Sequence, residues 1–293
     1  MPRTAYVNGR YLPHRQAAVH IEDRGYQFAD GVYEVVPVYQ GTLVDEELHL
    51  DRLERSLGEL RIALPMARRA LKLVAAEIMR RNGLTNGFVY MQVTRGVAPR
   101  DHKFPRKPVR PAVVMTVRQT RPLAPEVLEQ GIKIVTLPDI RWQRRDIKST
   151  SLLPNCLAKQ QAYEAGAFEA WLVEPDGLVT EGASTNAWIV TKDGKLVTRS
   201  ASNSILNGIT RISLLKVAAA EGVEFEERAF TVEEALEARE AFITASSIYV
   251  LPVTEIDGRP VGNGHPGMLS RKLREAYIER VARTGTFRAE AAA

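Results

Sequence analysis

One lysine and one glutamate stand in settings that could do chemistry together. Lys148 lies in the segment RRDIKSTSLLPNCLAKQQA, after a predicted strand and before a predicted helix. A lysine amine that is held deprotonated can form a Schiff base with an aldehyde cofactor. Glu181 follows further along, in TEGASTN, where its carboxylate could contact the ring nitrogen of such a cofactor. Because most lysines and glutamates are exposed, the local alternative is two surface residues.

Three other segments could bind anions. Residues 208–210 begin the predicted helix RISLLKVAAAEG, and the free N–H groups at a helix N-terminus bind phosphate. Arg52 lies on the flank of a leucine stripe, which by itself predicts a surface arginine, although a guanidinium can also clamp a phosphate. The third is the irregular stretch RGVAPRDHKFPRKPVRP, in which Asp101 is the one acid among basic residues. It is either a solvated basic loop or an anion receptor.

The N-terminal part of the chain predicts strands with two helices. Asn8-Gly9 and Gln40-Gly41 each separate two strand-like segments, as the turns of β-hairpins do. Leucines at spacings of three and four between residues 50 and 60 predict one helix. A second helix stops at Asn82-Gly83. The segments FVYMQVT and AVVMTVR are rich in β-branched residues and predict strands on either side of the basic stretch.

A second region begins after a proline-containing connection. The segments IKIVTL and AFITAS predict strands, and three further segments predict hairpins with Asp-Gly turns: AWLVEPDGLVTEG, AWIVTKDGKLVT and LPVTEIDGRPV. One helix begins near Ser151, because Pro154 is tolerated in a first turn. Another opens after Gly208, and Thr231 with Glu234 forms a capping box. The final residues, TGTFRAEAAA, are small and polar and predict a disordered tail.

The composition is that of an ordinary soluble globular protein. The 293 residues, 45% hydrophobic and 26% charged, suffice for one large domain or two smaller ones with ample core. No apolar run approaches a membrane span, and the N-terminus lacks a secretory signal. Cys156, the one cysteine, excludes an internal disulfide, fits a reducing cytoplasm and is expected to be buried. The net charge of +5 is scattered, and neither a nucleic-acid motif nor metal-ligand spacing is present.

Six segments resemble, in the same order, the class IV (fold-type IV) aminotransferases that use pyridoxal 5'-phosphate (PLP). The resemblance is strongest to their D-amino acid aminotransferase branch and covers nearly the whole chain. The segments are EDRGYQFADGVYEVV, HLDRL, QVTRGVAPRDHKFP, DIKSTSLLPNCLAKQ, VTEGASTN and ILNGITR. The resemblance implies an α+β, two-domain fold with PLP in the interdomain cleft. We expect a small N-terminal domain (1–121), a connection (122–130), a larger PLP-binding domain (131–283) and a tail (284–293).

The resemblance also assigns site residues. Lys148 would form the Schiff base and move the substrate proton, and Glu181 would contact the ring nitrogen. The other cofactor-binding residues would be Arg52, Leu206, Ile209, Thr210, Ser246 and Ser247. The substrate carboxylate would be bound by Tyr33 with Arg100 and His102, an R-x-H pair that crosses from the neighbouring subunit of a homodimer.

The resemblance implies a ping-pong reaction in which D-alanine gives its amino group to 2-oxoglutarate. Three alternatives stay open. A transaminase for branched-chain L-amino acids or primary amines would commonly lack the trio of Tyr33, Arg100 and His102. An aminodeoxychorismate lyase of the same fold would release pyruvate without any amino acceptor. A non-catalytic binding protein is disfavoured, since every catalytic position is filled.

Overall fold

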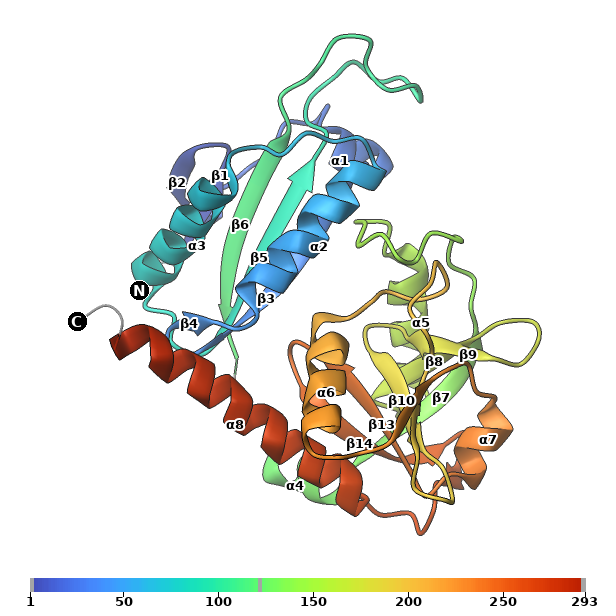
Figure 1. The fold of residues 1–293 in the computed structure, drawn as a ribbon. Helices are drawn as coiled ribbons and strands as arrows, with labels where there is room; N and C mark the ends of the chain where they lie inside the picture. The colour runs from blue at the N-terminus through green and yellow to red at the C-terminus, as the bar shows by residue number, and fades with distance from the viewer. Residues whose placement is uncertain (1–2, 121–122, 291–293) are drawn as a thin grey trace. The chain divides into compact units, whose positions relative to one another are not determined.

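The computed structural model describes residues 3–120 and 123–290. Contacts divide the chain into two units (Figure 1). Unit 1 comprises Met1–Arg121, Ile147–Ser151 and Thr284–Ala293, and unit 2 comprises Pro122–Asp146 and Leu152–Arg283. Each unit is described below by itself.

Unit 1 is built on a six-stranded antiparallel sheet in the order β2-β1-β6-β5-β3-β4. Its strands are β1 (Thr4–Val7), β2 (Arg10–Pro13), β3 (Gly31–Tyr39), β4 (Thr42–Leu43), β5 (Gly87–Thr94) and β6 (Ala112–Gln119). Its helical segments are η1 (His14–Gln16), α1 (Arg24–Phe28), α2 (Glu46–Glu59) and α3 (Arg68–Asn82). Both predicted hairpins are confirmed. Asn8, Gly9, Gln40 and Gly41 all have positive φ, as primed hairpin turns require.

Helices α2 and α3 cover one face of this sheet (Figure 1). The predicted leucine stripe of α2 is buried, and it packs with α3 against alternate residues of the strands. The core side chains include Leu50, Leu53, Leu57, Leu71, Ile78, Val89, Met91, Val93 and Met115. Because strand side chains alternate between faces, Tyr33, Tyr90 and Gln92 point away from this core. These three residues therefore lie on the face of the sheet opposite to α2 and α3.

Unit 2 contains a nine-stranded mixed sheet in the order β12-β11-β10-β13-β14-β7-β8-β9, with β15 on β14. Its strands are β7 (Ile132–Pro138), β8 (Glu169–Val173), β9 (Val179–Gly182), β10 (Asn186–Val190), β11 (Leu196–Thr198), β12 (Phe225–Glu227), β13 (Glu240–Ala245), β14 (Tyr249–Ile256) and β15 (Arg259–Pro260). Its helices are α4 (Pro125–Gln130), α5 (Leu153–Glu164), α6 (Ile209–Ala220), α7 (Val232–Glu237) and most of α8 (Met268–Glu290), which belongs to unit 1 from Thr284 on. Thr231 caps α7 as predicted, accepting a hydrogen bond from the Glu234 N–H at 3.0 Å.

Several expected boundaries differ from the structure. The expected connection 122–130 contains α4, because Pro125 at the start of a helix costs no hydrogen bond. Residues 147–151 belong to unit 1, since their backbone pairs with β3. Helix α8 was not predicted, and it continues through Glu290 across most of the expected tail, whereas residues 291–293 lie outside the described residues.

Two further sequence predictions concern the exposure of Cys156 and the presence of a membrane span. Cys156 is exposed, contrary to the expectation that it is buried, because its side chain lies on the outer face of α5. Among the described residues, no helix is both long and apolar enough to cross a membrane.

Candidate active site

The backbone around Lys148 is fixed by an isolated β-bridge between Ser149 and Val32, on the edge of β3. The Tyr33 N–H donates to the Lys148 carbonyl at 3.0 Å, and the Thr150 N–H donates to the Gly31 carbonyl at 3.0 Å. The Lys148 N–H donates to the hydroxyl of Ser56, a fully buried residue of α2, at 3.3 Å. The lysine is therefore positioned by long-range contacts within unit 1, not by a helix or strand of its own.

The side chain of Lys148 lies over an aromatic pair. Its Nζ is 4.3 Å from the centroid of the Tyr33 ring, and this ring stacks on Tyr90 with centroids 5.7 Å apart. The Tyr90 hydroxyl donates to Gln92 Oε1 at 2.6 Å. Burial, together with the nearby Tyr33, raises the pKa of Tyr90 to about 12, so it stays a neutral donor. The structure thus brings together two of the predicted residues, Lys148 and Tyr33.

Arg52 lies on the opposite face of β3, in a buried charge cluster. Its Nε and Nη2 each donate to Glu34 at 2.8 Å, and His49 Nδ1 lies 2.7 Å from Glu34 Oε2. Burial raises the pKa of Glu34, but the charge of Arg52 and its hydrogen bonds with Arg52 and His49 outweigh this, and the pKa lies well below its usual range. Glu34 is therefore a carboxylate that orients Arg52.

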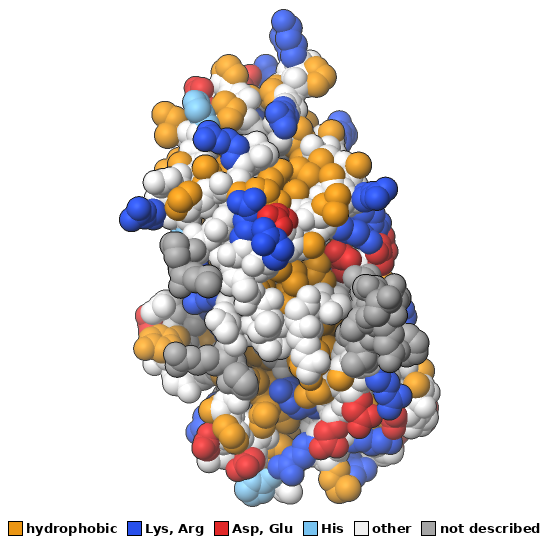
Figure 2. All heavy atoms as spheres, turned by 90° about the vertical axis from the view of Figure 1, so that its left-hand side faces the viewer, with side chains coloured by type: hydrophobic (Ala, Val, Ile, Leu, Met, Phe, Trp, Pro, Cys, Tyr) orange, Lys and Arg blue, Asp and Glu red, His pale blue; other side chains and the backbone are white. Residues whose placement is uncertain are grey.

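The predicted anion-binding loop extends beyond the end of the sheet in unit 1 (Figure 1). Arg100 and His102 are exposed, and both side chains contact the ring of Phe28 in α1. The Arg100 guanidinium lies 5.0 Å from the centroid of this ring, and the centroid of the His102 ring lies 5.5 Å from it. Between them, the Asp101 carbonyl accepts from buried Arg24 at 2.6 Å. The pair is thus held together at an anchored point of the loop. On the face shown in Figure 2, basic side chains are otherwise scattered among hydrophobic and acidic ones.

Arg95, which begins the same stretch, serves a different purpose. It is 7% exposed and contacts Asp30 through Nε at 2.7 Å and Nη2 at 2.9 Å. It also donates to the carbonyl groups of Leu60 and Arg61. This arginine therefore anchors the start of the loop inside unit 1, and it does not belong to the exposed set of basic residues.

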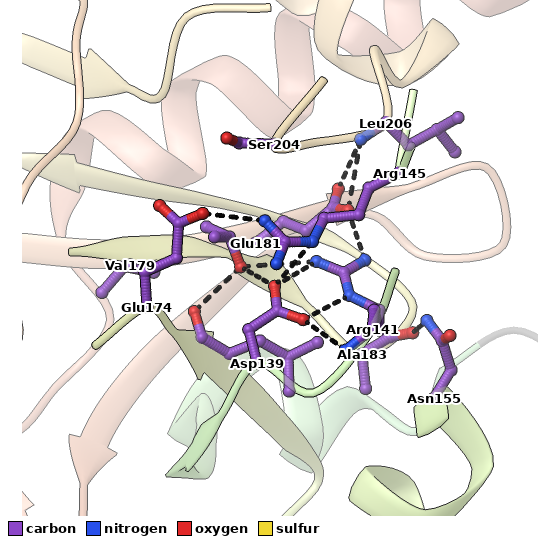
Figure 3. A network of polar contacts seen from close by, with 12 residues as sticks. Asp139, Arg141, Arg145, Asn155, Glu174, Val179, Glu181, Ala183, Ser204 and Leu206 are labelled. Atoms are coloured by element: carbon purple, nitrogen blue, oxygen red, sulfur yellow. Dashed lines mark hydrogen bonds and ion pairs between the residues drawn. The ribbon is translucent and has the colours of Figure 1, made fainter. Parts of the chain in front are cut away.

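Glu181 lies at the centre of a polar network in unit 2 (Figure 3). Its carboxylate is 4% exposed. It accepts from Arg141 Nη1 at 2.6 Å, from Asn186 Nδ2 at 3.0 Å and from the Leu206 N–H at 3.2 Å. Asn186 also donates to the Leu206 carbonyl at 2.9 Å. Glu181 is thereby tied to the segment that leads into α6.

Burial and the charge of Arg141 have opposite effects on the pKa of Glu181. Burial raises the pKa of Glu181, and the charge and hydrogen bond of Arg141 counteract only part of that effect. Burial also raises the pKa of Asp139, but its hydrogen bonds with Arg141 and Thr180 and the Arg141 charge bring it below its usual value. Asp139 is therefore the firmly ionised partner of Arg141, and Glu181 is the more readily protonated carboxyl.

Helix α6 begins at Ile209 and Thr210, both buried, with Gly208 as its N-cap residue. Because the N-cap residue is a glycine, it provides no side-chain capping hydrogen bond at this end. Such a terminus binds phosphate. Ser246 and Ser247 lie in the turn between β13 and β14, half-buried and exposed respectively. The described residues contain no group of three or more His, Cys, Asp or Glu side chains that could hold a metal ion.

Comparison with known proteins decides the family. The family model "Amino-transferase class IV" matches residues 31–256. This protein belongs to the class IV aminotransferases. The match spans β3 to β14 and includes most of the residues singled out above. As an aminotransferase it is an enzyme, and its mixed helix and sheet architecture is the one expected from the sequence.

Relatives within the class IV aminotransferases cover nearly the whole chain. The D-alanine aminotransferase of Bacillus licheniformis is 42% identical over 269 residues, 92% of this chain and 94% of the relative. That of Listeria monocytogenes serotype 4b is 39% identical over 276 residues, 94% of this chain and 95% of the relative. A solved structure, the T.th. branched-chain amino acid aminotransferase with pyridoxamine 5'-phosphate, matches this chain with a TM-score of 0.88 and 26% identity. The match covers 96% of this chain and 94% of the solved one.

Sequence reasoning missed the residues that hold the predicted ones. Asp139 and Arg141 stand two residues apart in DIRWQRRDIK, a charge cluster that was visible but had no assigned partner. Asn186 ends the TEGASTN segment and Glu34 follows Tyr33, yet neither carried a signal of its own. Their role depends on contacts between distant parts of the chain, such as Arg141 with Glu181 and Glu34 with Arg52.

Proposed function

We propose that this aminotransferase uses PLP to transfer the amino group of a D-amino acid, D-alanine first, to 2-oxoglutarate. The observation that carries the proposal is the 42% identity to a D-alanine aminotransferase over 92% of the chain. A further support is the R-x-H pair of Arg100 and His102. The solved branched-chain aminotransferase is much less similar, at 26% identity.

The residues present fit PLP. The cofactor needs an amine, a partner for its ring nitrogen and donors for its phosphate. Lys148 offers the amine, with its backbone fixed against β3. Glu181 offers a buried carboxyl, and α6 an N-terminus without a side-chain cap. Arg52, oriented by Glu34, would add a guanidinium for the phosphate.

In the proposed mechanism, each group has a separate task. When bound, PLP supplies an electron-withdrawing ring that accepts the electron pair left at the substrate Cα. Lys148 Nζ would hold the cofactor between turnovers, and during reaction it would move the proton from the substrate Cα to the cofactor C4'. The Glu181 carboxylate holds a proton at the ring nitrogen. Leu206, Ile209, Thr210, Ser246 and Ser247 would complete the cofactor site.

Tyr33, Arg100 and His102 would bind the carboxylate shared by the amino acid and the 2-oxo acid. Charge-assisted hydrogen bonds suit this task. We propose that the R-x-H pair reaches the site of a second copy in a homodimer. Exposed apolar side chains lie in this loop and next to it, namely Val97, Phe104 and Ile21. Residues 22–24 run alongside residues 96–98 through backbone hydrogen bonds, which brings the segments that carry Ile21 and Val97 together, and a second copy could cover these side chains.

A paired assay tests the function. Purified protein with PLP is given D-alanine or L-alanine, with and without 2-oxoglutarate, and pyruvate and glutamate are measured. Without 2-oxoglutarate, D-alanine should give at most about one pyruvate per site, because only the first half-reaction can run. With 2-oxoglutarate, pyruvate should form continuously from D-alanine, with much less from L-alanine. A preference for L-alanine would contradict the proposal and favour the branched-chain alternative. Pyruvate from aminodeoxychorismate without an acceptor would favour the lyase.

A further inference from the structure

Arg141 has no task in the mechanism above, yet it makes a close contact with the carboxylate on which that mechanism depends. Its Nη1 is 2.6 Å from Glu181 Oε1, and the side chain is 9% exposed (Figure 3). Its Nε and Nη2 donate to the two oxygens of Asp139 at 3.0 and 2.8 Å. The Thr180 hydroxyl donates to Asp139 at 2.8 Å. The guanidinium is therefore held in one orientation toward Glu181.

Of the two charged neighbours of Glu181, Arg141 has the larger effect on its pKa, and that effect lowers the pKa. Burial favours the neutral form of a carboxyl. Asp139 also disfavours ionisation of Glu181, but its influence is smaller than that of Arg141, which is in direct contact. At 4% exposure, Glu181 has little water to stabilise its charge. An ionised Glu181 consequently depends on the guanidinium beside it.

A proton between a carboxylate and a ring nitrogen is shared by two bases. It stays on the nitrogen only while the carboxylate is the weaker base. A cation within about 4–6 Å lowers the proton affinity of a carboxylate. If that cation is removed, the same proton moves from the nitrogen to a carboxylate oxygen, and the ring becomes neutral. No other reactant is gained or lost in this transfer.

We propose that Arg141 is a positioning residue that keeps a proton on the cofactor's ring nitrogen by holding Glu181 as a carboxylate, with Asp139 and Thr180 fixing the guanidinium. The inference rests on the proposed role of Glu181. It adds to that role the reason why Glu181 is ionised, namely its contact with Arg141 within unit 2.

The test uses holoenzyme reconstituted with PLP that is isotope-labelled at the ring nitrogen. The NMR shift of that nitrogen reports whether it carries a proton. In Arg141→Met the shift should move to the unprotonated value. Turnover should fall about ten- to a hundredfold, the loss expected for one hydrogen bond to a charged group. Arg141→Lys restores a cation and should recover part of both signals.

Arg145 provides a matched control. It is also 9% exposed and pairs with Asp139 at 3.4 Å and with Glu174 at 2.8 Å, rather than with Glu181. Arg145→Met should therefore keep the wild-type nitrogen shift. If Arg141→Met does not fold, Arg141→Gln, which keeps N–H donors without the charge, is measured instead. A wild-type shift in a folded Arg141→Met or Arg141→Gln protein overturns the inference.

Glu181→Gln separates this inference from the proposed function. If Glu181→Gln changes the nitrogen shift and Arg141→Met does not, Arg141 has no influence and the proposed role of Glu181 stands. If neither variant changes the shift, Glu181 does not contact the ring nitrogen, and both proposals fail.

Discussion

At the scale of single residues, Lys148 shows how a reactive side chain is held without strain. Its backbone pairs with Tyr33 on β3, and its amine lies over the ring of the same tyrosine. The aromatic face attracts a cation and offers no competing base. The amine is thus placed at the edge of β3, over the ring of Tyr33, while Glu34, the next residue of β3, orients Arg52 of α2.

Reduction by borohydride should attach PLP covalently to Lys148 in the wild-type protein. Lys148→Ala should bind PLP only non-covalently and lose at least about a hundredfold in turnover, the lower range for a lost general acid–base. Peptide mapping by mass spectrometry locates the adduct. Lys192→Ala, which changes a lysine 72% exposed, is the control and should keep both the adduct and the activity. An adduct on a different lysine would refute the assignment.

At the scale of elements, α6 depends on the close approach of its N-cap glycine to Asn186. A Cβ added at Gly208 would lie 2.1 Å from Asn186 Oδ1. Asn186 in turn donates to Glu181 and to the Leu206 carbonyl. The start of α6 and the position of Glu181 are therefore coupled through one amide side chain.

Gly208→Ala should weaken PLP binding, because Asn186 must move and disturb both Glu181 and the helix terminus. The dissociation constant of PLP, measured by spectroscopic titration of the apoprotein, should rise about tenfold, the loss of about one hydrogen bond. Gly58→Ala in α2 is the control: its added Cβ meets nothing within 4 Å. There, alanine should stabilise the helix by up to about 1 kcal/mol. Equal PLP affinity in Gly208→Ala and wild type would show that the two features are independent.

At the scale of the whole molecule, the question is which copy the R-x-H pair serves. Arg100 and His102 are exposed in a loop that extends beyond its own sheet, and apolar side chains beside it are exposed as well. If the loop acts in its own subunit, a dimer of two different inactive variants stays inactive. If the loop acts in the partner's site, such a mixed dimer regains activity.

Mixing Lys148→Ala and Arg100→Ala proteins tests this directly. Each variant alone should be nearly inactive with D-alanine. After unfolding and refolding together, activity should return to about a quarter of wild type, since half of the dimers are mixed and each has one complete site. Arg106→Ala, in the same exposed loop, should retain activity alone. If the mixture stays as inactive as its components, the pair acts within its own subunit.

Features with a local cause could be predicted from the amino-acid sequence. Asn8-Gly9 turns the first hairpin because these residues accept positive φ. Thr231 caps α7 through a group three residues away. The leucine stripe of α2 is buried because its spacing matches a helix. The family segments likewise identified an aminotransferase, since six motifs in one order are specific even where each is weak alone.

How the candidate site residues are held depends on contacts that form only in the folded chain. The pairing of Lys148 with β3 and the contact of Arg141 with Glu181 join segments far apart in the chain. No local preference encodes such a pairing, because its free energy comes from burial and from charges that meet only after folding. For the same reason, Arg95 was grouped with the exposed loop although it is buried against Asp30. Sequence patterns predicted the candidate catalytic residues, and packing set their orientation and charge.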